Sequence, residues 1–195
     1  GALLMITTPI ITYLASNILI RERFKTNKLL GIGVGLMGAA TLILSSIQDA
    51  GNSSPIGDMY IILNAISFSI YLILVKPLMS KYHPLTITFI CFLTGCIWVG
   101  IAGYEQAMAF DISKIPNQYY WNFGYVIFCA TFLVYFLNVI AIRAVSPTTV
   151  SSFIYLQPFF AILISIFFTD EKLTLYTSLG GILIIFGLWL INHKK

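Results

Sequence analysis

Charged residues are the first thing that this sequence has little of. They make up 9% of its 195 residues, while 58% of the residues are hydrophobic, and a soluble domain carries roughly 25% charged residues. This scarcity excludes a soluble globular domain. A formal net charge of +4 would suit nucleic acid, but the basic residues occupy short loops between apolar runs, so we expect no nucleic-acid partner.

Residues that hold metals or carry out catalysis are equally few. Cys91, Cys96 and Cys129 lie in apolar runs without the paired spacing of a metal or redox site, so we expect inert buried thiols. His83 and His193 form no cluster with them. An enzyme would need titratable groups gathered in one site, and the acidic residues are confined to predicted loops and their edges. We therefore predict no enzyme, no cofactor and no metal.

Long apolar runs are what the sequence has in abundance. An apolar helix of ~20 residues crosses a bilayer core of about 30 Å, whereas a membrane β-barrel needs alternating strands of ~10 residues. Backbone groups in lipid must bond within each segment, which favours helices. The sequence predicts an all-α polytopic membrane protein, surrounded by the lipid bilayer, with seven transmembrane helices at about 2–20, 29–47, 58–79, 86–104, 120–142, 148–168 and 174–192.

One stretch of the chain occurs twice. PIITYLASNILIRERFKTNKLLGIGVGLMG begins at Pro9, PFFAILISIFFTDEKLTLYTSLGGILIIFG begins at Pro158, and the two align without a gap at an offset of 149 residues. Internal repetition is strong evidence on architecture. The offset pairs Pro9 with Pro158, Glu22 with Glu171, Gly31 with Gly180 and Gly38 with Gly187.

The repeat predicts how the chain divides. Three apolar segments precede its second copy, and none precedes its first copy. We expect residues 1–47 to be the last two helices of a first five-helix unit whose first three helices are missing, 48–57 to be an external linker, and 58–195 to be a complete second unit. The parent protein is then a ten-helix fold, and its missing N-terminal helices are partners of this chain.

Loop charges predict the orientation. Nine of the eleven basic residues lie in loops 21–28, 76–85, 143–147 and 193–195, whereas six of the seven acidic residues lie in or beside the alternate loops 48–57, 105–119 and 169–173. By the positive-inside rule the first set is cytoplasmic, which places the C-terminus in the cytoplasm. The two copies then face opposite ways, as in the inverted repeats of several secondary transporter folds.

These residues carry a resemblance to a known family. The run Pro–x12–Glu–[Arg/Lys] followed by a Gly-x6-Gly helix, with SPTTVSSFIYLQPFFAILISIFFTDEKLT before the last helix, resembles the EamA domain of the drug/metabolite transporter superfamily. GDMYIILNAISFSIYLILVKPLMSKYHPLTIT is similar to the opening of that family's second repeat. The resemblance implies two inverted five-helix repeats in a bacterial cytoplasmic (inner) membrane, and export or exchange of amino acids and other small metabolites through a central cavity.

Polar side chains inside the apolar segments are the candidates for that cavity. Such groups are costly in lipid unless they find partners or line a wet cavity, and hydrogen bonding between helices is the alternative interpretation. Several of them share one helix face at i, i+3 or i+4, and i+7. The candidates are Thr8, Tyr13, Asn64, Ser67, Tyr71, Thr131, Tyr135, Asn138, Tyr155 and Gln157.

The repeated residues themselves suggest structural roles. Pro9 and Pro158 each remove a main-chain hydrogen bond within a predicted helix, so we expect helix bends beside the cavity. Glu22 and Glu171 each close one helix and precede the next. We expect their carboxylates to stabilise the hairpin by accepting hydrogen bonds from the first amides of the next helix, in preference to holding a gate shut through a basic partner. The repeated glycines predict close helix packing.

The leading function is a secondary carrier that works by alternating access. Without a carboxylate inside a predicted helix, either energy coupling resides in the missing helices or transport is exchange or facilitated diffusion, which we favour. A seven-helix receptor or photoreceptor shares the segment count, but needs no duplication, and the last helix lacks a lysine for a retinal Schiff base. A structural membrane protein without transport, and homodimerisation, stay open.

Overall fold

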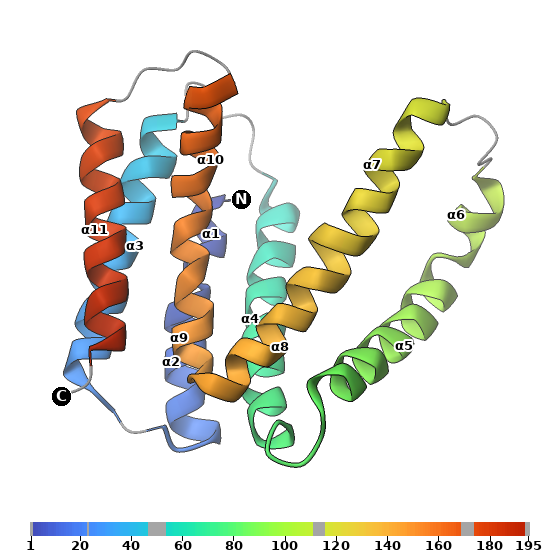
Figure 1. The fold of residues 1–195 in the computed structure, drawn as a ribbon, viewed down its shortest axis with the longest axis horizontal. Helices are drawn as coiled ribbons and strands as arrows, with labels where there is room; N and C mark the ends of the chain where they lie inside the picture. The colour runs from blue at the N-terminus through green and yellow to red at the C-terminus, as the bar shows by residue number, and fades with distance from the viewer. Residues whose placement is uncertain (1, 23, 47–53, 111–115, 169–173, 194–195) are drawn as a thin grey trace. The chain divides into compact units, whose positions relative to one another are not determined.

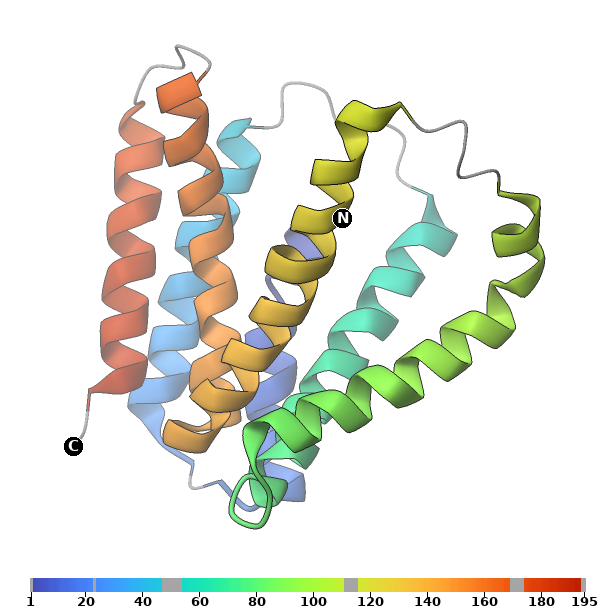
Figure 2. The same cartoon turned by 45° about the vertical axis from the view of Figure 1, so that its right-hand side comes forward.

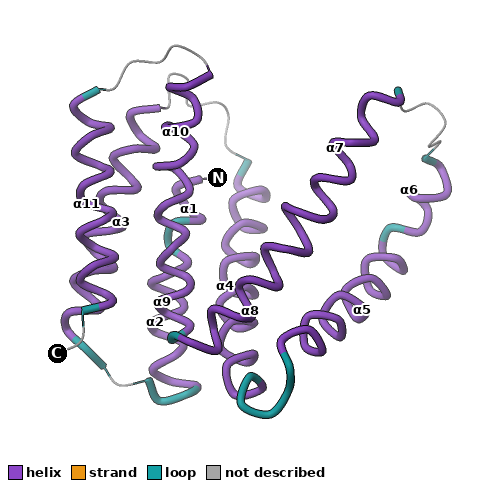
Figure 3. Tube along the Cα trace, viewed as in Figure 1, coloured by secondary structure: helices purple, strands orange, loops and turns teal. Residues whose placement is uncertain are grey.

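This computed structural model describes residues 2–22, 24–46, 54–110, 116–168 and 174–193. Within those ranges the chain is helical and holds no strand, as Figure 3 shows, so the predicted all-α class is confirmed there. The elements are α1 (Ala2–Met5), α2 (Thr8–Leu19), α3 (Thr26–Ser46), α4 (Pro55–Leu78), α5 (Pro84–Ala102), α6 (Tyr104–Ala109), the 3-10 turn η2 (Asn117–Tyr119), α7 (Tyr120–Tyr125), the π-helix η3 (Val126–Leu133), α8 (Val134–Ala144), α9 (Pro147–Ser152), the 3-10 turn η4 (Phe153–Tyr155), α10 (Leu156–Phe168) and α11 (Leu175–Asn192).

Six of these helical stretches are long and apolar enough to cross a membrane. They cover 26–45, 55–78, 84–102, 117–144, 147–166 and 175–192. The first predicted segment is represented by a shorter apolar helix, Leu3–Leu19. A polytopic membrane protein is therefore what the structure supports, and a total of seven spans stays a prediction.

One predicted loop contains helix. We expected residues 105–119 to form a loop, but α6 begins at Tyr104 and runs to Ala109. Glu105 lies in its first turn, where a carboxylate interacts favourably with the positive end of the helix dipole.

The chain divides into two compact units, which we describe separately. Unit 1 comprises Gly1–Leu74 and Val145–Lys195, and unit 2 comprises Val75–Ala144. Unit 1 therefore joins the N-terminal helices to α9, α10 and α11 from the far end of the sequence (Figure 1).

Hydroxyl caps define where two helices of unit 1 begin. Ser146 Oγ accepts a hydrogen bond from the Thr149 amide at 3.3 Å, and Pro147 occupies the first turn of α9. Thr174 Oγ1 caps α11 in the same way, accepting from the Thr177 amide at 3.2 Å. A capping hydroxyl satisfies one of the free amides at a helix start, and proline there loses no helical hydrogen bond.

Both repeated prolines lie just after a break in their helix. A two-residue turn separates α1 from α2, whose second residue is Pro9. The 3-10 turn η4 separates α9 from α10, whose third residue is Pro158. Pro9 lies in the first turn of α2, where its missing N–H loses no helical hydrogen bond. Pro158 follows a 3-10 turn inside a helical stretch that runs from Pro147 to Ile166, and the bend that we expect beside the cavity stays a prediction.

Helices α3 and α11 form the closest packed pair of unit 1, and they lie side by side in both ribbon views (Figures 1 and 2). Glycines make this approach possible. A methyl group added to Gly38 would lie 2.7 Å from the Gly180 carbonyl oxygen, and one added to Gly31 would lie 2.6 Å from the Gly187 carbonyl oxygen. Because residue number rises along one helix as it falls along the other, the two helices are antiparallel.

The contacts of this pair exchange the equivalent positions of the repeat. Gly31 and Gly180 occupy equivalent positions, as do Gly38 and Gly187. In the structure Gly31 meets Gly187, and Gly38 meets Gly180. Exchanging the two copies of the repeat therefore turns each of these two contacts into the other.

Unit 2 contains an unusual helix. From Val126 to Leu133 the chain forms a π-helix, and the Thr131 hydroxyl donates to the Val126 carbonyl, five residues earlier, at 2.8 Å. An aromatic cluster lies beside it, with Phe92 of α5 edge-on to Tyr135 at 5.7 Å between ring centroids. Such π-helical turns are rare and frequently occur at functional sites.

Candidate functional site

The hairpin between α2 and α3 is closed by main-chain contacts. Arg21 adopts a left-handed conformation, with φ of 52°, and the Glu22 amide donates to the Ser16 carbonyl at 3.1 Å. The Tyr13 hydroxyl donates to the Lys25 carbonyl at 3.2 Å and accepts from the Lys25 amide at 3.1 Å. Tyr13, a predicted cavity residue, is thus fully buried and uses its hydroxyl to hold the hairpin.

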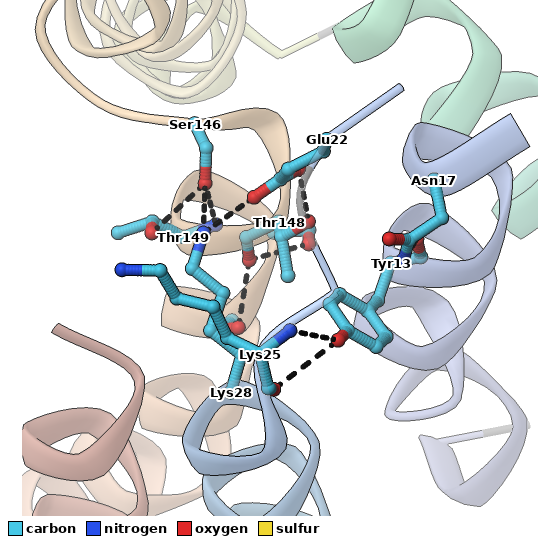
Figure 4. A network of polar contacts seen from close by, with 10 residues as sticks. Tyr13, Asn17, Glu22, Lys25, Lys28, Ser146, Thr148 and Thr149 are labelled. Atoms are coloured by element: carbon cyan, nitrogen blue, oxygen red, sulfur yellow. Dashed lines mark hydrogen bonds and ion pairs between the residues drawn. The ribbon is translucent and has the colours of Figure 1, made fainter. Parts of the chain in front are cut away.

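A cluster of polar side chains joins this hairpin to α9 (Figure 4). Glu22 Oε1 pairs with Lys28 Nζ, while Glu22 Oε2 accepts a hydrogen bond from Thr148 Oγ1 at 2.9 Å. Lys28 Nζ also donates to Ser146 Oγ at 2.9 Å. We call these four residues, Glu22, Lys28, Ser146 and Thr148, the hairpin cluster. It brings together two of the loops that the charge pattern assigns to one side of the membrane.

The contacts of Glu22 differ from those that we expected. Its carboxylate binds a lysine side chain and a hydroxyl of another helix, where we had predicted the first amides of α3. Its counterpart Glu171 lies outside the described residues. Sequence reasoning weighed a basic partner for Glu22 without naming Lys28. It missed Ser146 and Thr148, because contacts between residues 118 and 126 positions apart leave no local signal.

The ion pair is largely shielded from water. The side chains of Glu22 and Lys28 are 12% and 15% exposed, and Thr148 is completely buried. Hydrogen bonds to charged groups contribute about 1.5–3 kcal/mol each, and a partly buried charge that loses its partner is strongly destabilising. Because Glu22 and Lys28 belong to the same hairpin, their pairing does not depend on α9.

Helix α2 packs against α9, and small hydroxyl side chains are buried on both helices. Thr8, Thr12 and Ser16, four residues apart along α2, are all buried, and so are Ser151 and Ser152 of α9. We call these five residues the hydroxyl seam. Most of their hydroxyls bond to a carbonyl of their own helix or the preceding turn, as Thr12 does to Thr8 at 2.9 Å.

Two buried hydroxyls in unit 1 have no hydrogen-bond partner among the described residues. They belong to Ser16 and to Tyr155, a predicted cavity residue. The Tyr155 ring covers Gly35, where an added methyl group would lie 2.6 Å from a ring carbon. An unpaired buried hydroxyl is destabilising, so these two positions are where a water molecule or a polar ligand atom would be most favourable.

The three candidates on α4 share one face of the helix. Asn64 and Ser67 are exposed and Tyr71 is half-buried, whereas Ala65, Ser69 and Leu72 form the buried face. Ser69, which was not predicted, accepts a hydrogen bond from Thr12 of α2 at 2.9 Å. The Asn64 amide makes no hydrogen bond to another described residue.

The three candidates of unit 2 lie along its π-helix and α8. Thr131 is half-buried with its hydroxyl bonded to its own helix. Tyr135 packs against Phe92, and Asn138 is half-buried, with an amide that bonds to no described residue. Of the remaining candidates in unit 1, Thr8 is buried and bonded to Met5, while Gln157 is exposed.

Groups that could hold a metal are not gathered in the described residues. No group of three or more His, Cys, Asp or Glu side chains occurs there. Cys91 and Cys96, which we predicted to be buried thiols, are exposed on a helix that is apolar enough to face lipid.

Comparison with known proteins shows which family the chain belongs to. A family model described as the EamA-like transporter family matches residues 55–193. An "Uncharacterized transporter" of Archaeoglobus fulgidus is 24% identical over 182 residues, covering 91% of this chain and 61% of that protein. The "Uncharacterized transporter YdfC" of Bacillus subtilis is 27% identical, covering 96% of this chain and 60% of its own length.

A solved structure supports the fold alone. Described only as "Crystal structure of protein", it is 16% identical, has a TM-score of 0.76, and is matched over 97% of this chain and 64% of that chain. The chain thus spans less than two thirds of each of these relatives. From the family match over most of its length and its apolar helices, we conclude that the chain is an integral membrane protein that belongs to the EamA-like transporter family.

Proposed function

We propose that this chain is part of a secondary carrier that moves small metabolites, such as amino acids, across a bacterial cytoplasmic membrane by alternating access. The whole carrier has ten helices in two inverted five-helix units. Residues 1–47 belong to the first unit and 58–195 to the second, joined by an external linker at 48–57, with the C-terminus in the cytoplasm.

The observation that carries this proposal is the packing of α3 against α11. These helices are equivalent in the sequence repeat, are antiparallel in space, and exchange their equivalent glycines at the contact. A twofold axis perpendicular to both helices produces that arrangement. For helices that cross a bilayer, such an axis lies in the membrane plane, as in carriers built from inverted repeats.

Local irregularities of two helices, a turn before Pro9 and a 3-10 turn before Pro158, add a second line of support. The breaks before Pro9 and Pro158 occur at equivalent positions of the two copies. In inverted-repeat carriers, substrate sites lie near interrupted helices at mid-membrane, where main-chain groups become free to bind ligand. We place the substrate cavity beside these breaks, with the unpaired Tyr155 hydroxyl as its strongest polar candidate in unit 1.

Further candidates for the cavity lining are polar side chains on apolar helices, which need contact with water or with other polar groups. Asn64 and Ser67 form an exposed polar face on an otherwise apolar helix, and Asn138 is unpaired within unit 2. Because an amide facing lipid is costly, we infer that these residues face the cavity or the helices that complete the carrier. The neutral character of these groups fits exchange or facilitated diffusion of metabolites that are partly polar and partly apolar.

The test is transport by the full-length polypeptide in proteoliposomes. Counterflow of a panel of isotopically labelled amino acids and small metabolites should reveal at least one substrate that accumulates against an unlabelled internal pool. Residues 1–195 alone should give no counterflow, because part of the cavity wall is missing. Transport by residues 1–195 alone would contradict the inverted-pair architecture.

A further inference from the structure

We propose that the hairpin cluster is a reversible latch. Its hydrogen bonds hold the α2–α3 hairpin against α9 when the carrier is closed to the cytoplasm, and they break when the carrier opens to that side. This inference rests on the proposed function, because it assumes that the carrier opens alternately to the two sides. In the structure the latch is engaged through Thr148 to Glu22 and Lys28 to Ser146.

The arrangement of charges makes the latch reversible. The carboxylate and the ammonium group both belong to the α2–α3 hairpin, so they remain paired with each other when α9 moves away. Among the described residues, separation breaks the hydrogen bonds of Glu22 to Thr148 and of Lys28 to Ser146, while the two charged groups keep each other as partners. The Ser146 hydroxyl keeps its capping bond to the Thr149 amide after release.

The contact between α2 and α9 next to the latch is also suited to movement. The serine hydroxyls of α9 bond within their own helix, as Ser152 does to the Thr148 carbonyl at 2.7 Å. On the α2 side, Thr12 bonds to Ser69 of α4 and not to α9. The α3–α11 pair is different, because its backbones meet at glycines. Packed interfaces change between discrete arrangements and do not deform continuously. We infer that α3 and α11 stay together while the seam between α2 and α9 opens.

The test measures exposure of the seam without measuring transport. Ser152, fully buried in the seam, is replaced by cysteine in the full-length protein, from which the native cysteines have been removed. A membrane-impermeant methanethiosulfonate reagent is then applied to the cytoplasmic side of inside-out vesicles. With Thr148→Val, which removes the donor to Glu22, labelling of Ser152→Cys should become about tenfold faster, equivalent to about 1.4 kcal/mol.

Thr149→Val is the matched control. Thr149 is the next residue of α9 and is also buried, and among the described residues its hydroxyl bonds to Ser146 of its own helix cap. Thr149→Val should leave the labelling rate of Ser152→Cys unchanged. Thr148→Ser, which keeps the hydroxyl that donates to Glu22, should label as slowly as the protein with Thr148. Equal rates for Thr148→Val and Thr149→Val would overturn the latch.

A second variant keeps the test decisive if Thr148→Val does not yield folded protein. The pair Glu22→Gln and Lys28→Gln replaces charge-assisted hydrogen bonds with weaker neutral ones, and labelling should become about threefold faster. An unchanged rate in that double variant would reject the latch. Because labelling needs no substrate, a carrier that shows no transport in proteoliposomes but labels as predicted would put the proposed function in doubt, and not the latch.

Discussion

The glycine contact between α3 and α11 makes a sharp stability prediction for Gly38→Ala. A methyl group at Gly38 would lie 2.7 Å from the Gly180 carbonyl oxygen and 2.9 Å from the Ile184 amide nitrogen. Ordinary van der Waals contact begins near 3.4 Å, so α11 would have to retreat by about 0.7 Å. The nearest atoms are main-chain atoms, which cannot turn aside as a flexible side chain could.

Two opposing effects set the magnitude. Replacing glycine by alanine within a helix contributes roughly 1 kcal/mol in favour of the folded state. Overpacking a tight interface costs roughly 1–3 kcal/mol, and here the cost falls at the upper end because moving α11 also loosens the contact of Gly31 with Gly187. We expect Gly38→Ala to destabilise the protein by about 1–2 kcal/mol.

Gly33→Ala provides a matched control on the same helix. An added methyl group at Gly33 meets no atom within 4 Å, so the helix gain of about 1 kcal/mol should appear undiminished. The assay is thermal unfolding of the full-length protein in detergent, followed by the loss of monodisperse protein on size exclusion. The midpoint should fall for Gly38→Ala and rise or stay level for Gly33→Ala. A Gly38→Ala protein as stable as Gly33→Ala would refute the packing argument.

Three further changes test the hairpin and the helix break. Arg21→Gly should raise the unfolding midpoint, because a left-handed conformation costs an L-residue roughly 1–2 kcal/mol and glycine almost nothing; a lower midpoint would contradict this interpretation of the turn. Tyr13→Phe removes both bonds to Lys25 and should destabilise the folded protein by about 1–3 kcal/mol while substrate affinity stays the same. Weakened substrate binding with unchanged stability would instead indicate that the Tyr13 hydroxyl contacts the substrate. Pro158→Ala should lower the transport rate with little effect on expression. Unchanged transport kinetics would show that the helix irregularity at Pro158 plays no part in transport.

Composition and periodicity were sufficient for the coarse architecture. Lipid leaves the backbone few options, so apolar runs of about the right length predicted helices, and the helices from α3 to α11 lie where those runs were. The glycine spacing of the repeat predicted close packing, which the structure confirms at Gly31, Gly38, Gly180 and Gly187. The helix breaks before the prolines were harder to place, because proline is compatible both with a kink and with a helix start.

Long-range polar contacts were beyond sequence reasoning. Glu22 carried a recognisable hairpin signal, but its partner Thr148 is 126 residues away, and no local pattern relates the two. Tyr13 was predicted as a cavity residue from its polar group in an apolar segment, and only the fold reveals its bonds to Lys25. The π-helix at 126–133 was missed because its composition is that of any apolar helix.

The sidedness of the two repeated hairpins tests the central claim most directly, since alternating access by inverted repeats requires them to face opposite ways. Single cysteines at Lys25 and Lys172, in the full-length protein without its native cysteines, are exposed to a membrane-impermeant maleimide in intact cells and in inside-out vesicles. We predict that Lys25→Cys reacts only in inside-out vesicles and Lys172→Cys only in intact cells. Reaction of both cysteines from the same side would contradict the inversion and the mechanism built on it.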